Sequence, residues 1–538
     1  MSKSEPVILP EKYYLDYFNY VLEFVEKQYD HVLDMPEHLF YQSFRNLSEQ
    51  AQCLYLRFSN RRGDFFRINK VSYAEIPDLH EAKSELIHHG FIQINESDDP
   101  IQFNLFTKNE LIEAFDFLLK PQKKSELLGE LTIEDLVLIH EREEVAQVLK
   151  NEEVEFIKLL FFGNRYGGVT DFVIRDVGNV KIEKLESENF KPWFQSREEA
   201  LAVMHVSQLR RMVRDLLSEN LPLEDYLEDL PWHVWLSFPQ SAKSTTKLLL
   251  KVAYYFEQVD LLGDAIKYYS LIDQHPARER RIRILEKQDK KEEAIKIANQ
   301  ILDKPSNASE LTFATDYLNR KGIRINRSMT ERLKSAPSIS IPTPQNERVE
   351  NAVLSYFEEL GWDGTHAENY LWRGLFGLVF WEIIFDTRHG SFHHPLQRQP
   401  SDLNDATFFE TRQNLLEEKL RTLRTKKQLE TSLKRTHDEK MGTANRFVTW
   451  HKSLLPNLTI MASKIPLKSL KKVLIEMSKN MKENSTGFPD LFLWNNDEYI
   501  FYEVKSPNDQ LSAQQLFWLD FLQATKIKVD VLRVQYSD

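Results

Sequence analysis

The pattern of apolar and polar positions is clearest near the C-terminal end, where it predicts a β-hairpin, a helix and a final strand. Residues 491–494 form a short apolar run, residues 495–498 are turn formers, and residues 499–505 are aromatic and β-branched. Such a series is typical of two antiparallel strands joined by a tight turn. Apolar residues then recur at helical spacing over 511–522, and a β-branched run covers 528–534. We therefore expect an α/β domain with a mixed β-sheet at this end of the chain.

Upstream, the pattern is mostly helical. Residues 375–385 are apolar nearly all round, which predicts a buried core helix. Residues 264–276 recur at 293–305, at an offset of 29 residues, and each copy is an amphipathic stretch that ends in proline. This repeat predicts α-hairpins of the tetratricopeptide kind, with a period shorter than the usual value of roughly 34 residues. Repeats of this kind commonly present a surface to a protein partner.

The chain is long enough, at 538 residues, for roughly three or four domains. Residues 334–344 contain three prolines among small polar residues, which is typical of a linker. Thr107 and Thr132 each precede a short helical pattern, as N-capping residues do. We expect a multidomain, mainly α protein. Its predicted parts are an N-terminal region (1–100), a small helical module (101–145), a helical continuation (146–235), helical repeats (236–334), a linker (335–347) and the α/β domain (348–538).

Composition excludes several classes of protein. The hydrophobic content of 42% supports folded cores, and Cys53 is the only cysteine, so there is neither a disulfide framework nor a cysteine-rich zinc cluster. The N-terminus lacks a charged and then apolar signal peptide, and no apolar run reaches the length of a membrane span. We therefore expect a cytoplasmic protein with no membrane partner.

The net charge of −12 is distributed unevenly along the chain. Residues 421–480 hold 14 Lys and Arg against 4 Asp and Glu. A local excess of positive charge beside an acidic site is what a DNA phosphate backbone requires. Arg424, Lys426 and Lys427 are the candidate DNA contacts in this stretch. The alternative interpretation is a solvated helix face with ordinary salt-bridge patterning.

Aromatic and basic residues interleave in a second stretch, over residues 54–73. Such interleaving is typical of nucleic-acid-binding surfaces. The candidate DNA-binding residues here are Arg57, Arg61, Arg62 and Arg67. A helix followed by a turn and a strand, with exposed arginines, is the alternative interpretation.

The predicted hairpin brings together residues that carry chemistry. Asp490 precedes the first strand, and Glu503 and Lys505 lie two positions apart on the second, so these two side chains share one face while Val504 points away. Two carboxylates are the hard oxygen ligands that Mg²⁺ or Mn²⁺ prefers, and the backbone carbonyl of Val504 is a candidate further ligand. A metal there would polarise a phosphate and lower the pKa of a bound water. The pattern predicts metal-dependent phosphodiester hydrolysis, with Asp490, Glu503 and Lys505 as the catalytic residues.

Gln515 falls in the first turn of the following helix, where it is a candidate for positioning the nucleophilic water or a phosphate. An aspartate after a proline, as at Asp490, and a glutamate two positions before a lysine, as at Glu503, each occur often by chance. A surface strand that bears Glu and Lys is ordinary. Both halves at hairpin spacing, followed by a helix that carries Gln515, favour a nuclease.

Three histidines cluster at His389, His393 and His394. A zinc site needs ligands that converge from helical or knuckle spacing, and this series without a cysteine is a poor match. We interpret it as a loop that lines the active site or lies on the surface.

Residues 487–491, 503–512 and 515–519 resemble the VRR nuclease domain of the PD-(D/E)XK superfamily and, more narrowly, the Fanconi-associated nuclease family. Residues 366–385 resemble the acidic helix that this family carries far upstream of the hairpin. The resemblance implies that Glu368 is a metal ligand; on the residues alone, a carboxylate favoured by a helix N-terminus is the alternative.

What the resemblance implies extends over nearly the whole chain. It implies two Mg²⁺ or Mn²⁺ ions, held by Glu368, Asp490, Glu503 and the carbonyl of Val504. It also implies DNA binding by the N-terminal region and a SAP-like fold for the small helical module. The implied activity is that of a structure-selective 5′-flap endonuclease with 5′→3′ exonuclease activity on branched or flapped double-stranded DNA, used in the repair of interstrand crosslinks.

The modest length is typical of a compact bacterial member of the family, which would associate with the nucleoid; a eukaryotic member would be nuclear. Two other functions fit the same residues. A Holliday-junction resolvase or a restriction-type endonuclease has the same core but usually acts as a dimer. A non-catalytic repeat scaffold that only binds DNA would not require all four of the acidic and basic residues at the site.

Overall fold

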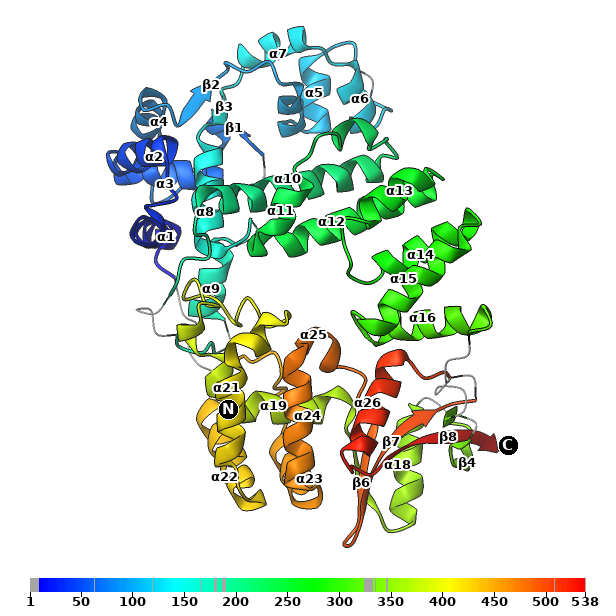
Figure 1. Ribbon diagram of the computed structural model, residues 1–538. Helices are drawn as coiled ribbons and strands as arrows, with labels where there is room; N and C mark the ends of the chain where they lie inside the picture. Colours follow the sequence, from blue (N-terminus) through cyan, green and yellow to red (C-terminus); the bar gives the residue numbers. More distant parts are fainter. Residues whose placement is uncertain are drawn as a thin grey trace. The chain divides into compact units, whose positions relative to one another are not determined.

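The computed structural model describes residues 9–537 except 62, 119, 166, 179–180, 186–189, 324–331, 334, 345–346 and 508. Helices predominate (Figure 1). The chain divides into two compact units, the first made of Met1–Asn179 and Pro192–His205 and the second of Val180–Lys191 and Val206–Asp538. Helix α10 (Arg197–Ser218) contributes residues to both units. In the described part of the chain, none of the helices combines the length and the apolar character that crossing a membrane requires.

The first unit combines a small antiparallel sheet with helices. Strand β3 (Val145–Val148) pairs with both β1 (Phe65–Arg67) and β2 (Ile92–Ile94). Thr107 caps its helix as predicted, because the threonine side chain accepts from the amide of Glu110. The helices are α1 (Tyr13–Tyr29), α2 (Met35–Arg45), α3 (Glu49–Ser59), η1 (Ile68–Lys70), α4 (Leu79–His88), η2 (Pro100–Leu105), α5 (Lys108–Ala114), α6 (Lys124–Glu130), α7 (Ile133–His140), α8 (Asn151–Phe162) and α9 (Val169–Val177).

Helical hairpins form the repeats of the second unit. The two predicted copies fall on α13 (Leu262–Tyr269) and α15 (Lys291–Asp303). Equivalent alanines, Ala265 and Ala294, are fully buried in them, where small side chains allow close helix packing. The prediction that each copy runs to its proline is wrong for α13, which ends well before Pro276. The neighbouring elements are η4 (Glu224–Tyr226), α11 (Trp232–Ser237), α12 (Pro239–Gln258), α14 (Ala277–Lys287) and α16 (Ala308–Arg320).

A five-stranded mixed sheet lies in the C-terminal part of the second unit, in the strand order β4-β8-β7-β6-β5. The predicted antiparallel hairpin is present as β6 and β7, and β8 runs parallel to β7 with Arg533 opposite Lys505. The linker prediction is wrong over β4, which pairs in parallel with β8, because its alternating sequence buries Ile341 in the apolar layer below the sheet. The strands are β4 (Ser338–Pro342), β5 (Asp363–His366), β6 (Leu491–Trp494), β7 (Tyr499–Lys505) and β8 (Val529–Ser537).

Helices cover both faces of this sheet. Helix α18 (Val349–Glu359) packs on the face that carries Val504 and Leu532. The other face is covered by α26 (Ala513–Ala524) and by helices inserted between β5 and β6. The inserted elements are α19 (Glu368–Val379), α20 (Trp381–Ile384), η5 (Thr387–His389), α21 (Thr407–Thr422), α22 (Lys426–Lys440), α23 (Leu454–Lys464), α24 (Leu467–Lys479) and α25 (Met481–Asn484).

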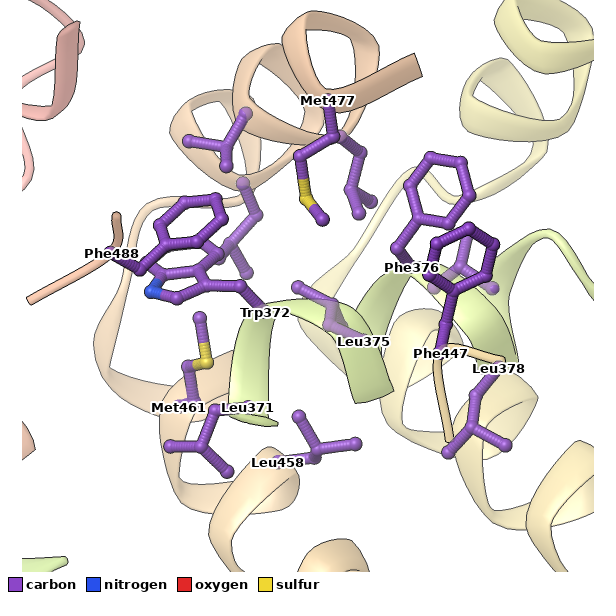
Figure 2. Packing of buried hydrophobic residues seen from close by; sticks show 14 of the residues in the cluster. Leu371, Trp372, Leu375, Phe376, Leu378, Phe447, Leu458, Met461, Met477 and Phe488 are labelled. Atoms are coloured by element: carbon purple, nitrogen blue, oxygen red, sulfur yellow. The ribbon is translucent and has the colours of Figure 1, made fainter. Parts of the chain in front are cut away.

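The predicted core helix is buried, as two short helices, α19 and α20, instead of one. Figure 2 shows Trp372 and Leu375 of α19 among apolar side chains from the other inserted helices. The Trp372 ring stacks on Phe488, with 5.1 Å between ring centroids and 17° between planes. Phe488 also stacks on Trp518 of α26, at 4.1 Å. The loop that precedes β6 is thereby anchored to the core on both sides.

Candidate active site

Backbone hydrogen bonds fix Asp490 immediately before β6. Its carbonyl oxygen accepts from the amide of Ala367 at 2.7 Å and from the amide of Glu368 at 3.2 Å. Its carboxylate oxygen Oδ2 accepts from the amide of Val504 at 2.8 Å. These bonds place Asp490 between the first turn of α19 and strand β7.

Glu503 and Lys505 lie on one face of β7, as the alternation predicts. Lys505 Nζ is 2.9 Å from Glu503 Oε1 and donates to Gln515 Oε1 at 3.2 Å. The side-chain nitrogen Nε2 of Gln515 donates to the same oxygen of Glu503. The Val504 side chain packs in the apolar layer on the opposite face. Gln515 therefore connects α26 to both charged groups.

The N-cap of α26 holds Gln515 in this position. Ser512 is the N-cap, and its Oγ accepts from the amide of Gln515 at 3.2 Å. In return, Gln515 Oε1 accepts from the amide of Ser512 at 2.8 Å. This reciprocal capping box fixes the side chain of Gln515. Its contact with a water or a phosphate stays a prediction, and its contacts with Glu503 and Lys505 are observed.

Burial raises the pKa of both carboxylates at the site. Glu503 is 1% exposed, and burial, with repulsion from Asp490 as the second cause, raises its pKa to about 8. Burial likewise raises the pKa of Asp490 to about 6, against the opposing hydrogen bond from Val504. Buried carboxylates of this kind are stabilised when a cation takes the place of the proton.

The donor atoms present fit a hard divalent cation. Oxygen Oε2 of Glu503 is buried and makes no hydrogen bond within the described residues, so it can accept a ligand. Asp490 and the backbone of Val504 adjoin Glu503, and carboxylate and carbonyl oxygens are the donors that such cations prefer. The described residues contain no preassembled group of three or more His, Cys, Asp or Glu, and Lys505 and Gln515 engage the second oxygen of Glu503.

Glu368 is exposed at the first position of α19. Its Oε1 accepts from the side-chain amide of Asn369 at 3.0 Å. Its charge adds to the causes that raise the pKa of Asp490 and of Glu503. The fold therefore brings Glu368 to the same site electrostatically, and its role as a metal ligand stays a prediction.

Glu350 is an acidic residue near the site that the sequence analysis missed. It lies in the first turn of α18, and its charge also raises the pKa of Asp490. The adjacent Asn351 is hydrogen-bonded to His366, the last residue of β5, at 2.7 Å. An acidic residue in the first turn of a helix is too common a signal to single out Glu350 from the sequence.

Two of the predicted DNA-binding arginines in the first unit are held by carboxylates. The Arg57 guanidinium is hydrogen-bonded to Glu75 at 2.8 Å. Arg67 pairs with Glu110 at 2.7 Å and with Glu143 at 2.5 Å. Their partners give both arginines a structural role in the unit.

The other predicted DNA contacts differ in exposure. Arg61 is exposed, whereas Arg62 lies outside the described residues. In the second unit, Arg424 and Lys427 are exposed, and Lys427 lines a depression of about 430 Å³ beside α22. The Lys426 ammonium donates to a backbone carbonyl. DNA binding by these residues stays a prediction.

The histidine-bearing loop is packed into the interior, so its interpretation as surface is wrong. His393 is 5% exposed and His394 is 8% exposed. Nitrogen Nε2 of His393 lies 2.9 Å from Ser401 Oγ, and Nδ1 lies 3.2 Å from the carbonyl oxygen of Lys191. Burial lowers the pKa of His393 to about 4. These partners lie outside the candidate active site.

Comparison with protein families identifies both ends of the chain. The family model described as "FAN1, HTH domain" matches residues 12–93. The family model described as "VRR-NUC domain" matches residues 424–536, a range that contains Asp490, Glu503 and Lys505.

Curated relatives are similar over nearly the whole chain or over part of it. A Fanconi-associated nuclease 1 homolog of Pseudomonas aeruginosa is 29% identical over 98% of this chain and 97% of its own length. The homolog of Arabidopsis thaliana is 25% identical over 96% of this chain and 66% of its own length. Human Fanconi-associated nuclease 1 is 31% identical over 36% of this chain and 20% of its own length.

Solved structures are similar over nearly the full length. A crystal structure of paFAN1 bound to 2nt 5′flap DNA with gap has a TM-score of 0.86 and 27% identity, and the match covers 99% of this chain and 100% of that one. A second, of paFAN1 bound to 1nt 5′flap DNA with gap, has a TM-score of 0.82 and 27% identity over 98% of this chain and 100% of that one. The similarity in fold therefore includes both units and the nuclease sheet.

Proposed function

This chain belongs to the Fanconi-associated nuclease family, and we propose that it is a structure-selective DNA nuclease that cuts 5′ flaps. One observation carries the proposal. The buried Glu503 and the half-buried Asp490 lie beside Lys505, in a chain that matches over 99% of its length a protein crystallised on 5′-flap DNA. Branched or flapped double-stranded DNA is therefore the proposed substrate.

Nucleases of this family depend on a divalent metal. We assign Mg²⁺ or Mn²⁺, as two ions, and the residues that would hold them are Asp490, Glu503, Glu368 and the carbonyl of Val504. Bound ions of this kind polarise the scissile phosphate and lower the pKa of a bound water. The uncommitted oxygen of Glu503 and the raised pKa values of Glu503 and Asp490 support this assignment.

The other groups of the site act on the phosphate and on the carboxylates. Lys505 supplies a fixed positive charge next to Glu503, which offsets negative charge as it develops on the phosphate. Gln515 orients Glu503 and Lys505 together through one amide group. Because the capping box with Ser512 fixes Gln515, the charged groups are aligned before substrate arrives.

Selection of DNA shape is assigned to the parts that precede the nuclease domain. Residues 1–100 would bind duplex DNA, residues 101–145 would form a SAP-like module, and the repeats over 236–334 would connect them to the nuclease domain or bind a protein partner. Family membership further supports 5′→3′ exonuclease activity and a role in the repair of interstrand crosslinks. Among the described residues, no specific feature favours the resolvase or the scaffold alternative.

A comparison of three labelled substrates tests the proposal. A 5′-flap duplex, a 3′-flap duplex and a four-way junction are incubated with Mn²⁺, with and without a chelator. We expect the wild type to cut the 5′ flap fastest and only when metal is present, and Asp490→Ala to leave it intact. If wild type and Asp490→Ala leave the flap equally intact, the protein is not a nuclease of this kind. Preferential cleavage of the junction would favour the resolvase alternative.

A further inference from the structure

Two arginines beside the candidate active site are bonded only to neutral groups among the described residues. Arg373 lies on α19, and its Nε donates to the carbonyl oxygen of Ser485 at 2.7 Å. Arg446 lies in the loop between α22 and α23, and its Nη1 donates to Asn404 Oδ1 at 2.7 Å. Arg373 is partly buried, where a positive charge is ordinarily paired. The remaining donors of both guanidinium groups are free to bind a ligand.

Gly377 accounts for the proximity of the two arginines. It lies one turn after Arg373 on the same face of α19. A Cβ at Gly377 would meet Val448 Cγ2 at 2.6 Å and Phe447 Cβ at 3.0 Å. The missing side chain lets the loop that carries Arg446 lie directly against α19. Burial and, second, the charge of Arg446 lower the pKa of Arg373, against the weaker opposing effect of the Glu368 charge, which agrees with this placement.

A third donor at the same place is Asn445. Its Oδ1 accepts from the amide of Phe447 at 2.9 Å. Its Nδ2 is buried and has no hydrogen-bond partner among the described residues. A buried amide group without an acceptor is destabilising. Two guanidinium groups and one amide NH₂ group can all be satisfied by the oxygens of an anion.

The loop before β6 ties this cluster to the candidate active site. It follows α19 from Arg373, which bonds Ser485, to Glu368, whose amide bonds Asp490. Five residues of helix separate Arg373 from Glu368, which is about 8 Å along the helix axis. An anion at Arg373 would therefore lie close to the phosphate at the active site.

We propose that Arg373, Arg446 and Asn445 bind a backbone phosphate of the DNA strand that is cut, close to the scissile phosphate. This inference rests on the proposed function, because it describes how the same site holds its substrate. Planar guanidinium groups bind phosphate through paired hydrogen bonds. A phosphate on Arg373 would also steady the loop that carries Asp490, through the bond to Ser485.

Binding of a fluorescent 5′-flap duplex in Ca²⁺ tests the proposal, with wild type, Arg446→Gln, Arg446→Lys and Arg373→Lys. Lys528→Gln is the matched control, because it removes one exposed positive charge that pairs with Glu498 at the turn end of the sheet. We expect Arg446→Gln to weaken binding about 10-fold and to reduce the salt dependence by about one phosphate contact. Lys528→Gln should change neither, and Arg446→Lys should restore part of the affinity.

A second measurement locates the phosphate. Single phosphates of the flap strand are replaced by neutral methylphosphonates, and affinity is measured for wild type and Arg446→Gln. We expect one position close to the cut to weaken wild-type binding without weakening Arg446→Gln further. The proposal is overturned if Arg446→Gln binds as Lys528→Gln does, or if every position weakens both proteins equally.

The two proposals fail separately in these experiments. Cleavage of the same flap by wild type in Mn²⁺ tests the proposed function and not the phosphate site. If wild type cuts no substrate but Arg446→Gln still binds more weakly than wild type, the nuclease proposal is refuted and the phosphate site is retained. Equal thermal unfolding of Arg446→Gln and wild type shows that the fold is intact.

Discussion

The backbone amide of Glu368 donates a hydrogen bond to the carbonyl oxygen of Asp490 at 3.2 Å, although the helices from α19 to α25 separate the two residues in the sequence. This bond joins the start of α19 to the start of β6. Glu503 reaches the same place from β7, and Gln515 reaches it from α26. The candidate active site is therefore assembled from four segments, each fixed by backbone hydrogen bonds or by a helix cap.

Gln515→Leu should lower the rate of DNA cleavage roughly 10- to 100-fold, the usual effect of removing a group that orients metal-site residues. Leucine has a similar size but cannot bond Glu503 or Lys505, so these charged groups lose their alignment. The control is Gln523→Leu on the same helix, where the side chain bonds the carbonyl of Val529 and none of the site residues. Single-turnover rates measure the effect, and equal rates for the two variants would show that Gln515 has no orienting role.

Gly487→Ala should destabilise the protein and slow cleavage. Gly487 has a φ of +83°, and a Cβ there would lie 2.7 Å from Gln514 Cγ and 2.9 Å from its carbonyl carbon. The loop that carries Asp490 would have to move away from α26. Urea unfolding and single-turnover cleavage measure the two effects.

Gly442→Ala is the matched control for this substitution. Gly442 has a φ of +77° and open space around the Cβ position, so alanine adds only the left-handed strain of roughly 1–2 kcal/mol. We expect Gly487→Ala to lose more stability than Gly442→Ala and to lose activity as well. Equal losses would mean that the contact with Gln514 is unimportant.

Glu503→Gln should stabilise the metal-free protein and abolish its response to metal. Burial and repulsion from Asp490 disfavour the Glu503 carboxylate, and glutamine, which does not ionise, removes that cost. The same change removes the ligand, so Mg²⁺ should raise the melting temperature of wild type and leave that of Glu503→Gln unchanged. Glu498→Gln, an exposed change on the same hairpin, should keep the wild-type response. A metal-dependent shift in Glu503→Gln would place the ion elsewhere.

The stability of the second unit should fall in mild acid because of His393. Burial lowers its folded-state pKa to about 4, from 6.5. The unfolded chain binds the proton first, so the stability that neutral His393 provides is present above pH 6.5 and is lost as the pH falls toward 4. Burial lowers the pKa of His394 to about 3, which acts in the same direction.

Melting temperatures between pH 7 and pH 4 measure this loss. His393→Gln should reduce the slope of melting temperature against pH in this window. His88→Gln, at an exposed histidine, should leave the slope as in wild type. An unchanged slope in His393→Gln would assign the acid sensitivity to other groups.

Local pattern was sufficient for the β6–β7 hairpin and for the presence of the repeats, but not for strand β4, which pairs over a long range. The alternation over 499–505 and the turn before it predicted β7 and its partner β6 correctly. Strand β4 was missed because prolines at both ends of its short alternation suggest a linker, and its strand partner β8 is distant in sequence. The end of α13 was placed too far along because the repeat alignment followed Pro276 and not the helix itself.

At the site, residues on one hairpin were predictable, and residues brought in by tertiary contacts were not. Glu503 and Lys505 share a strand, so their common face followed from alternation. Glu350 and the pair Arg373 and Arg446 reach the site only through helix packing, which leaves no periodic signal. Burial of His393 has the same origin, because its partners lie on separate segments.

The central claim is that Asp490 acts in metal-dependent cleavage of flapped DNA. Single-turnover cleavage of a 5′-flap duplex in Mg²⁺, with binding to the same duplex measured in Ca²⁺, tests it most directly for wild type and Asp490→Asn. We predict that Asp490→Asn cuts at least about 1000-fold more slowly and still binds the duplex. Cleavage by Asp490→Asn at the wild-type rate would contradict the account.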